Sequence, residues 1–341
     1  MKSIVLAEPG KFRLENVDEP AAPARNEVQV RVLQVGICGT DLHAFEGKQP
    51  FFTYPRILGH ELAVEVIELG PTDEDHNLKI RDRCFMQPYL NCGQCGACRR
   101  GRDNCCAKMQ VFGVHCDGGM REIVNVPLKK LIKARHTDDE LALVEMLSIG
   151  AHAVRRAEVV SSDTVLVIGV GPIGLGVALY AMETGARVIA VDISELRLDF
   201  ANKHLGIQHC ISAREDILER LHMMTAGELP TAVFDVTGSS KSMHSSFQFT
   251  AHGGRLTFVG LCPGDIGFND PEFHRRELTL FASRNANRQD FEHVLQSLDR
   301  MRIDVSAWIT HRASPQGMIE EFTAWLNPSS NVIKAMMMFS S

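Results

Sequence analysis

Apolar and polar residues alternate in short segments through the first part of the chain, from Ile4 to about Ala134. Residues 27–32, which read EVQVRV, place an apolar side chain at every second position. This period of two predicts strands that bury one face. Turns separate the segments, so the pattern predicts a β-rich, loop-rich domain.

The pattern changes near Glu140, where apolar residues such as Leu141, Val144 and Leu147 recur at helical spacing. Beyond Thr164, short apolar segments alternate with helical patterns. Strands are expected at residues 165–168, 187–191, 209–211, 232–236, 255–259 and 278–281. Strands joined by helices in this way predict an α/β domain with a doubly wound parallel sheet.

The tail of the chain begins at about Gln289. It predicts a helix through residues 291–298, a second helix at residues 318–325 and a final strand at residues 333–338. We expect this tail to return to the first domain, and a length of 341 residues suits two domains. We therefore predict one domain of residues 1–150, completed by residues 288–341, and a second of residues 151–287.

Composition narrows the class of protein. Apolar residues at 45% and charged residues at 23% are average for a soluble globular chain, and basic residues form only short, isolated clusters within a net charge of −6. The first residues are too short an apolar run for an export signal, and no stretch has the length to cross a bilayer. We expect a cytoplasmic protein without nucleic-acid or membrane partners.

Of its ten cysteines, seven lie between Cys84 and Cys116, which in a reducing compartment points to metal.

A glycine-rich turn follows the first strand of the second domain. Residues 169–174 read GVGPIG, a helical pattern follows, and Asp192 ends the next strand, 18 residues after the last glycine. In this context the motif predicts a dinucleotide site, with backbone N–H groups and a helix N-terminus at the pyrophosphate. Asp192 is expected to bind the adenosine ribose and to favour NAD over NADP, while Arg197 blurs that preference. The predicted cofactor contacts are Gly169, Gly171, Pro172, Ile173, Gly174, Asp192 and Arg197, with Val259, Gly260, Leu261, Ser283, Arg284 and Asn285 at the ends of later strands.

Two groups of residues have the spacing of metal ligands. Four thiolates lie within 15 residues, which suits a closed, structural zinc site: Cys92, Cys95, Cys98 and Cys106. Cys105 leaves the fourth ligand open, and an iron–sulfur cluster is the competing interpretation. The second group combines Cys38 with His60 and Glu61, the mixed ligand set of a catalytic zinc with one open position. Taken singly, these three also fit a buried apolar thiol, a hydrogen-bonded loop histidine and a surface charge.

With these motifs in this order, the chain resembles the zinc-containing medium-chain alcohol dehydrogenases over its whole length. The resemblance implies a GroES-like catalytic domain, a Rossmann domain for NAD, and two zinc ions per chain, one catalytic and one structural. It assigns Cys38 and His60 as catalytic zinc ligands, Thr40 and His43 as a proton relay, and Asp41 as a residue that orients a ligand. Glu145 matches the glutamate that polyol, threonine and sugar-acid members carry near the metal. Whether Glu61 or Glu145 binds zinc directly stays open.

Within that family, the chain is most similar to bacterial L-galactonate-type and starvation-sensing oxidoreductases, at residues 47–52, 111–115, 270–274 and 283–286. The resemblance implies oxidation of a secondary alcohol of a sugar acid or polyol, with L-galactonate as the best candidate and His115 and Arg284 as candidates for its carboxylate. Arg121 is more typical of a solvated surface. A sorbitol-like or L-threonine dehydrogenase is the alternative enzyme, and a regulatory NAD-binding protein without turnover is the alternative class. Members of this length are often dimers or tetramers. The chain departs from the family pattern at Val64, Arg81 and Met146-Leu147.

Overall fold

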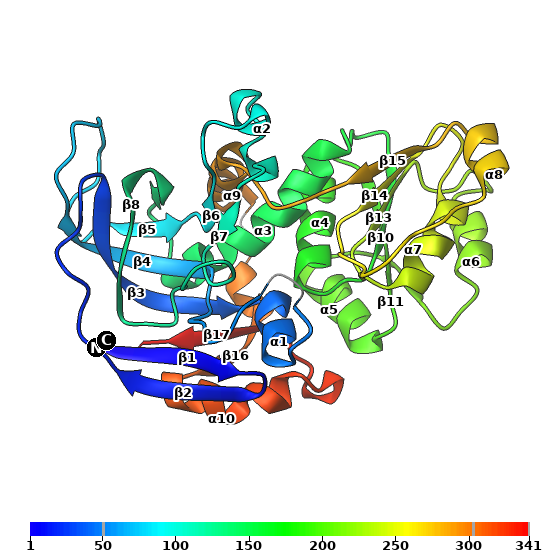
Figure 1. Cartoon of the computed structure of the whole chain (residues 1–341). Coiled ribbons are helices and arrows are strands. Elements are labelled where there is room, and N and C mark those ends of the chain that lie inside the picture. Colours follow the sequence, from blue (N-terminus) through cyan, green and yellow to red (C-terminus); the bar gives the residue numbers. More distant parts are fainter. Residues whose placement is uncertain (50–51, 302–303, 340–341) are drawn as a thin grey trace. The chain divides into compact units, whose positions relative to one another are not determined.

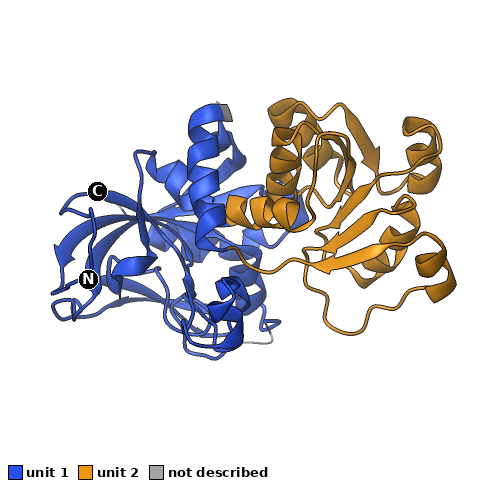
Figure 2. Cartoon of the chain, turned by 90° about the horizontal axis from the view of Figure 1, so that it is seen from above, with its two compact units in different colours: residues 1–145, 287–300, 304–341 blue, residues 146–286, 301–303 orange. Residues whose placement is uncertain are grey.

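The structure is a computed structural model, and it describes residues 1–49, 52–301 and 304–339. Residues 50 and 51 of the segment 47–52 lie outside the described part. The chain divides into two compact units, coloured separately in Figure 2. Unit 1 comprises Met1–Glu145, Asn287–Arg300 and Asp304–Ser341, and unit 2 comprises Met146–Ala286 and Met301–Ile303. The division at Glu145 falls inside a helix, α3 (Asp138–Arg156), as does the predicted division at residue 150.

Unit 1 is built around a seven-stranded sheet whose main path runs β16-β17-β3-β4-β5-β9, with β8 paired to β3 (Figure 1). The elements of this unit before α3 are β1 (Lys2–Glu8), β2 (Lys11–Asn16), β3 (Glu27–Ile37), α1 (Gly39–Phe45), β4 (Glu61–Leu69), β5 (Arg83–Met86), β6 (Tyr89–Leu90), α2 (Gly96–Arg99), η1 (Asp103–Cys105), β7 (Gln110–Val111), β8 (Ile123–Pro127), η2 (Leu128–Lys130) and β9 (Leu131–Lys133). The tail adds α9 (Arg288–Met301), η4 (Val305–Trp308), β16 (Ile309–Ala313), α10 (Pro315–Trp325), η5 (Pro328–Ser330) and β17 (Lys334–Met338).

The tail completes the sheet of unit 1. Strand β17 pairs antiparallel with β3, with Met336 opposite Gly36. The predicted final strand and both predicted tail helices are confirmed. Strand β16 is absent from the prediction because it lies at the edge of the sheet, where Thr310 and Arg312 face solvent and the apolar alternation is lost.

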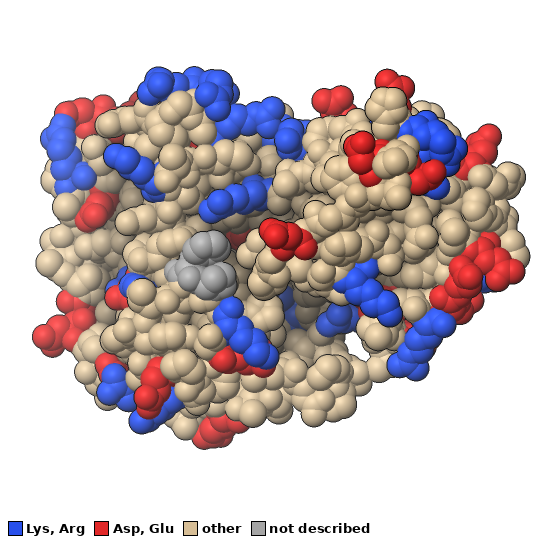
Figure 3. Space-filling model, turned by 45° about the vertical axis from the view of Figure 1, so that its right-hand side comes forward, with Lys and Arg blue, Asp and Glu red and all other residues tan. Residues whose placement is uncertain are grey.

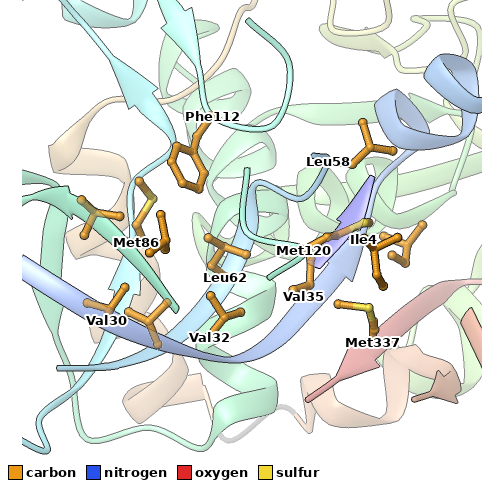
Figure 4. Packing of buried hydrophobic residues seen from close by; sticks show 14 of the residues in the cluster. Ile4, Val30, Val32, Val35, Leu58, Leu62, Met86, Phe112, Met120 and Met337 are labelled. Carbon is orange, nitrogen blue, oxygen red and sulfur yellow. The ribbon is translucent and has the colours of Figure 1, made fainter. Parts of the chain in front are cut away.

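The core of unit 1 lies on the inner face of this sheet. Val30, Val32, Leu62 and Met86 come from neighbouring strands and pack together with Phe112 (Figure 4). All five are at most 5% exposed, so the apolar positions of the alternating segments form one continuous core. Val64, which replaces a family glycine, is fully buried in the same cluster.

Unit 2 contains a six-stranded parallel sheet in the order β12-β11-β10-β13-β14-β15. Helices α4 and α5 lie on one side of it, and α6 and α7 on the other (Figure 1). Every predicted strand of this sheet is present, so the doubly wound α/β fold is confirmed. The elements are β10 (Thr164–Ile168), α4 (Pro172–Glu183), β11 (Arg187–Asp192), α5 (Glu195–Leu205), β12 (His209–Ser212), α6 (Ile217–Met224), β13 (Ala232–Asp235), α7 (Ser240–Ser246), η3 (Phe247–Phe249), β14 (Arg255–Phe258), α8 (Asp270–Arg275) and β15 (Thr279–Ala282).

On the face drawn in Figure 3, Lys and Arg are mixed with Asp and Glu over most of the surface, and several Lys and Arg lie close together along the upper edge. Among the described helices, none combines the length and the apolar character that crossing a membrane requires.

Candidate active site and metal centres

Cys38, His60 and Glu61, here called the mixed cluster, come together at one end of the sheet of unit 1. Cys38 follows β3 and begins α1, while His60 immediately precedes β4, whose first residue is Glu61. Because β3 and β4 are paired, with Gly36 opposite Glu61, the three residues lie close in space. One ligand atom from each lies within 4.8 Å of the others. The mixed cluster therefore offers a thiolate, an imidazole and a carboxylate to a single ion.

Asp41 lies behind the imidazole of His60. Its Oδ2 accepts a hydrogen bond of 2.9 Å from the backbone N–H of Cys38, and its Oδ1 lies 3.8 Å from His60 Nδ1. Asp41 is 1% exposed and His60 4%. The carboxylate is thus fixed at the start of α1 and faces the ring nitrogen, the arrangement by which a carboxylate orients a metal-binding histidine.

Glu61 is paired with a lysine from the far end of the sequence. Lys334, the first residue of β17, contacts Glu61 Oε2, and both side chains are buried. The carboxylate lies directly over Gly36, because a Cβ there would come within 2.1 Å of Glu61 Oε2. Burial alone would lower the pKa of Lys334, but Glu61, then Cys38, outweigh burial and raise it. Lys334 therefore stays charged beside the mixed cluster.

Glu145 lies on α3, and its charge acts on His60 of the mixed cluster. It is 5% exposed, and its Oε1 accepts a hydrogen bond from the hydroxyl of Tyr89, which is 3% exposed. Burial raises the pKa of Glu145, although His60 opposes that shift. Burial, and then the charge of Glu145, raise the pKa of Tyr89 well above its usual value, so the phenol remains a donor.

The charges around His60 fit a divalent cation. Burial alone would lower the pKa of His60, but Asp41, Cys38 and then Glu145 outweigh it and raise the pKa well above its usual value. Acidic groups and a thiol thus gather around one imidazole and one ammonium. Within the described residues, the buried atoms His60 Nδ1 and Asp41 Oδ1 also lack a hydrogen-bond partner. A cation held by the mixed cluster offsets this excess of negative charge.

Thr40 and His43, the predicted relay, lie one helical turn apart on α1. His43 is exposed, and its Nδ1 lies 3.7 Å from Glu46 Oε2. Thr40 is partly buried beside Cys38. Thr40 lies near the mixed cluster and His43 lies at the surface, so the order of the two residues suits a proton relay from the cluster to solvent.

The cysteine lobe, residues 92–106, brings four sulfurs together. The Sγ atoms of Cys95 and Cys98 are 3.5 Å apart, those of Cys95 and Cys106 are 3.9 Å apart, and those of Cys106 and Cys92 are 3.5 Å apart. Four sulfurs placed about 2.3 Å from a central zinc are separated by about 3.8 Å, so the lobe fits a tetrahedral ion. Cys105 is exposed and is not part of this group, so the arrangement of the sulfurs favours Cys106 as the fourth ligand.

Backbone N–H groups surround these sulfurs. Those of Cys92 and Lys108 each donate to Cys106 Sγ over 3.3 Å. Hydrogen bonds from the backbone of Cys98 and Ala107 lower the pKa of Cys95 to about 6, whereas burial raises the pKa of Cys98 to about 11. The loop backbone therefore favours the thiolate at Cys95, whereas burial favours the neutral thiol at Cys98.

The glycine-rich turn in unit 2 depends on the absence of side chains. Gly169 has a φ of +88°, and a Cβ on Gly174 would lie 1.8 Å from Gly169 O. Gly171 caps α4, and Pro172 occupies its first turn together with Ile173. The exposed N–H groups at this helix start fit the pyrophosphate of a dinucleotide, and no other residue type fits these two glycine positions.

Asp192 lies at the end of β11, next to this turn. Its Oδ2 accepts from the N–H of Val170 over 2.8 Å, and its Oδ1 accepts from the N–H of Ser194 over 2.9 Å. The guanidinium of Arg197 lies 3.6 Å from the position of a Cβ on Gly171. An acidic and a basic side chain thus both lie next to the glycine-rich turn in unit 2.

The remaining predicted cofactor residues follow the carboxyl ends of two neighbouring strands, Val259, Gly260 and Leu261 after β14 and Ser283, Arg284 and Asn285 after β15. A residue the sequence analysis missed belongs to the same edge. Thr237 follows β13, next to β10 where the strand order reverses, and its hydroxyl donates to Asp235 over 2.7 Å. The sequence could have indicated Thr237, because the residues that follow each strand of such a sheet lie at this edge.

The residues considered for a substrate carboxylate are dispersed. In unit 1, His115 is exposed and its Nδ1 accepts from the N–H of Val111 over 3.0 Å. Arg121 is partly buried, and its guanidinium contacts the backbone carbonyl of Asp117 at 3.5 Å. Arg284 belongs to unit 2. The contacts of His115 and Arg121 thus tie each side chain to the backbone of its own loop in unit 1.

Comparison with known proteins covers nearly the whole chain. Residues 24–136 match the alcohol dehydrogenase GroES-like domain family, and residues 172–300 match the zinc-binding dehydrogenase family. The chain is 40% identical over 318 residues to L-galactonate-5-dehydrogenase of Escherichia coli K12, with 93% of each chain covered. It is 29% identical to the starvation-sensing protein RspB of the same strain, with 100% of each covered. A crystal structure of rspB from E. coli CFT073, described as complexed with NADH, superimposes with a TM-score of 0.91 at 27% identity, covering 99% of each chain.

The chain belongs to the zinc-type medium-chain alcohol dehydrogenase family. This membership confirms the predicted combination of a GroES-like domain with a Rossmann sheet. It also confirms the predicted class, an NAD-dependent oxidoreductase.

The departures from the pattern of this alcohol dehydrogenase family have local explanations. Arg81 replaces a turn glycine yet keeps the backbone conformation that glycine prefers, with a φ of +74°. Met146 and Leu147 replace Pro-Phe and are buried residues of the unbroken helix α3. Neither change disturbs Glu145, which precedes them.

Proposed function

We propose that this chain oxidises a secondary alcohol of a sugar acid to the keto acid, with L-galactonate as the best candidate substrate and NAD as the hydride acceptor. The observation that carries the proposal is the convergence of Cys38, His60 and Glu61 within 4.8 Å. Their mixed chemistry suits a catalytic zinc rather than a structural one. The choice of substrate is supported by the 40% identity to L-galactonate-5-dehydrogenase over 93% of the chain.

In this proposal two zinc ions are bound, a catalytic ion by the mixed cluster, with Glu145 as the alternative carboxylate, and a structural ion by the four cysteines. Zinc at the mixed cluster supplies Lewis-acid chemistry, which brings the pKa of a bound hydroxyl toward neutrality. Asp41 keeps His60 oriented, and Thr40 and His43 carry the hydroxyl proton to solvent. The closed set of four thiolates leaves no ligand position for a substrate, so the cysteine lobe holds its loop.

In unit 2, the backbone at Gly169 to Gly174 binds the NAD pyrophosphate. Asp192 accepts hydrogen bonds from the adenosine ribose hydroxyls, and its charge disfavours the 2′-phosphate of NADP. Arg197 contacts the phosphates. The residues that follow β13, β14 and β15 bind the nicotinamide half, because ligands of such sheets lie outside the carboxyl ends of the strands.

The proposal is tested by a substrate screen with the full chain, zinc and NAD. L-galactonate, sorbitol and L-threonine are compared by the rate of NADH formation, and the expected order places L-galactonate first. Cys38→Ser and His60→Ala should each abolish turnover while metal analysis still finds about one zinc per chain in the cysteine lobe. A higher rate on sorbitol or L-threonine would replace the sugar acid by a polyol or an amino acid. Full turnover in either variant, or no turnover on any alcohol, would overturn the dehydrogenase proposal.

A further inference from the structure

Two buried carboxylates, Glu61 of the mixed cluster and Glu145 on α3, are held by different kinds of donor. Lys334 pairs with Glu61, so a full positive charge neutralises that carboxylate. Glu145 is held at Oε1 by the hydroxyl of Tyr89. A phenol orients a carboxylate without cancelling its charge, whereas an ammonium does both. Among the described contacts, Glu145 is therefore held by a neutral donor, whereas Glu61 is held by a charged one.

Tyr89 is itself rigidly placed. Its ring lies 6.0 Å from that of Phe291, which in turn lies 4.9 Å from that of Phe85. The backbone of Tyr89 is paired with Val111 across the β6–β7 hairpin, three residues before the first ligand of the cysteine lobe. A tyrosine buried in this way has few alternative rotamers, so its hydroxyl marks a fixed point in space.

The side chain of Glu145 is flexible, so the position of its carboxylate depends on a fixed hydrogen-bond partner. Glutamate has three rotatable side-chain bonds and loses up to about 1.5–2 kcal/mol of rotamer entropy when it is immobilised. It lies on α3, whereas Cys38 follows β3 and His60 precedes β4 of the sheet of unit 1. The hydrogen bond to Tyr89 ties the helix residue to the hairpin and so restricts the position of the carboxylate relative to the sheet.

We propose that Tyr89 is a positioning residue for the catalytic metal: its hydroxyl holds Glu145 through Oε1, so that Oε2 is the oxygen available to the ion. This inference rests on the metal site of the proposed function. It goes beyond that proposal by assigning a role to a residue that contacts neither the metal nor the substrate. The competing explanation is that Tyr89 only packs against Phe291.

The variant that separates the two explanations is Tyr89→Phe, because phenylalanine keeps the ring and removes only the hydroxyl. Cobalt(II) replaces zinc as the probe, and the absorption lost in Cys38→Ser identifies the band of the mixed cluster. We expect Tyr89→Phe to shift this band and to weaken metal binding in a chelator competition by about 10–100-fold, the usual effect of losing a partner of a metal ligand. An unchanged band together with unchanged affinity would overturn the inference.

Tyr54→Phe is the matched control. Its hydroxyl also donates to a buried acceptor in unit 1, the carbonyl of Ala44, and its loss should leave the cobalt band and the metal affinity unchanged. If Tyr54→Phe reproduced the effect of Tyr89→Phe, the effect would be a general loss of stability and the inference would fail.

A double-variant cycle tests whether Tyr89 acts through Glu145. Adding Tyr89→Phe to Glu145→Gln should weaken metal binding no further than Glu145→Gln alone, since residues in one network do not act additively. Additive losses would show that Tyr89 acts by another route and would overturn the inference. If the wild-type chain had no cobalt band that depends on Cys38, the proposed function itself would fail, which is a different result.

Discussion

Gly36 is the position at which one added methyl group should disconnect Glu61 from Lys334. In Gly36→Ala the new Cβ would lie 2.1 Å from Glu61 Oε2 and 3.0 Å from Glu61 Cβ. Non-bonded carbon and oxygen atoms approach to about 3.3 Å, so the carboxylate must retreat by about 1.2 Å. A retreat of this size breaks the contact with Lys334, which is 2% exposed and cannot reach water.

The cost follows from the burial of the pair. Removing the partner of a buried ion typically costs about 3–5 kcal/mol. Replacing glycine by alanine lowers the conformational entropy of the unfolded chain, which offsets about 0.4–1 kcal/mol of that cost. We therefore expect Gly36→Ala to lower the free energy of unfolding of unit 1 by about 2–4 kcal/mol. Metal affinity at the mixed cluster should fall as well, because Glu61 leaves its position.

The assay is urea unfolding followed by tryptophan fluorescence. The only two tryptophans, Trp308 and Trp325, are buried in unit 1, so the signal reports this unit and not unit 2. Gly317→Ala in α10 is the control, because its Cβ would come no closer than 3.4 Å to Ser314 Oγ, and it should be neutral or slightly stabilising. If Gly36→Ala were as stable as the wild type and bound zinc as tightly, the placement of Glu61 over Gly36 would be refuted.

Three further predictions address other parts of the chain. Arg81→Gly should raise the stability of unit 1 by about 0.5–1 kcal/mol in the same fluorescence assay, since it relieves a left-handed residue, while Arg81→Ala should give no gain. Burial would raise the pKa of Asp163, but the hydroxyl of Thr231, a backbone N–H and Arg255, 2.5 Å away, lower it. The carboxylate therefore stabilises the fold fully above its unfolded pKa of about 3.9, and this stabilisation is lost as the pH falls through the lower folded pKa. Asp163→Asn should lower the free energy of unfolding by about 2–4 kcal/mol at pH 7, measured by circular dichroism, and by progressively less as the pH falls below about 3.9. A cost that does not change with pH would contradict this. After metal removal, Cys95, with a pKa of about 6, should react with iodoacetamide at pH 7 more than about tenfold faster than Cys98, with a pKa of about 11. Peptide mapping by mass spectrometry measures the two alkylation rates, and equal rates would refute the loop geometry.

The sequence was sufficient for the architecture because each element carries its own periodic signal. The six strands of unit 2 are short apolar runs separated by helices, and the glycine turn between β10 and α4 has a required order of residue types. The cysteine lobe was predicted for the same reason, since its four ligands are neighbours in sequence. What made these features predictable is that their defining contacts are local.

The carboxylates of the active site could not be assigned in this way. Whether Glu61 or Glu145 is free to bind metal depends on the residues that contact them. Lys334, the partner of Glu61, is 273 residues away from it in the sequence, and Tyr89, the partner of Glu145, is 56 residues away. A lysine within the apolar segment 332–338, which reads VIKAMMM, was a usable sign of a buried charge in need of a partner. Tyr89 gave no comparable sign, because a tyrosine before a cysteine motif fits a packing role equally well.

Unit 1 is made of chain segments that precede and follow unit 2, so unit 1 is the last of the two to be completed during synthesis. A ribosome releases the chain from its N-terminus, so all of residues 146–286 emerge before Lys334 and the strand that it begins. The Rossmann sheet and the cysteine lobe can therefore form during synthesis, from contiguous segments. Lys334, the counter-ion of Glu61, is synthesised only later, so a nascent chain can complete its cysteine lobe before it completes its mixed cluster.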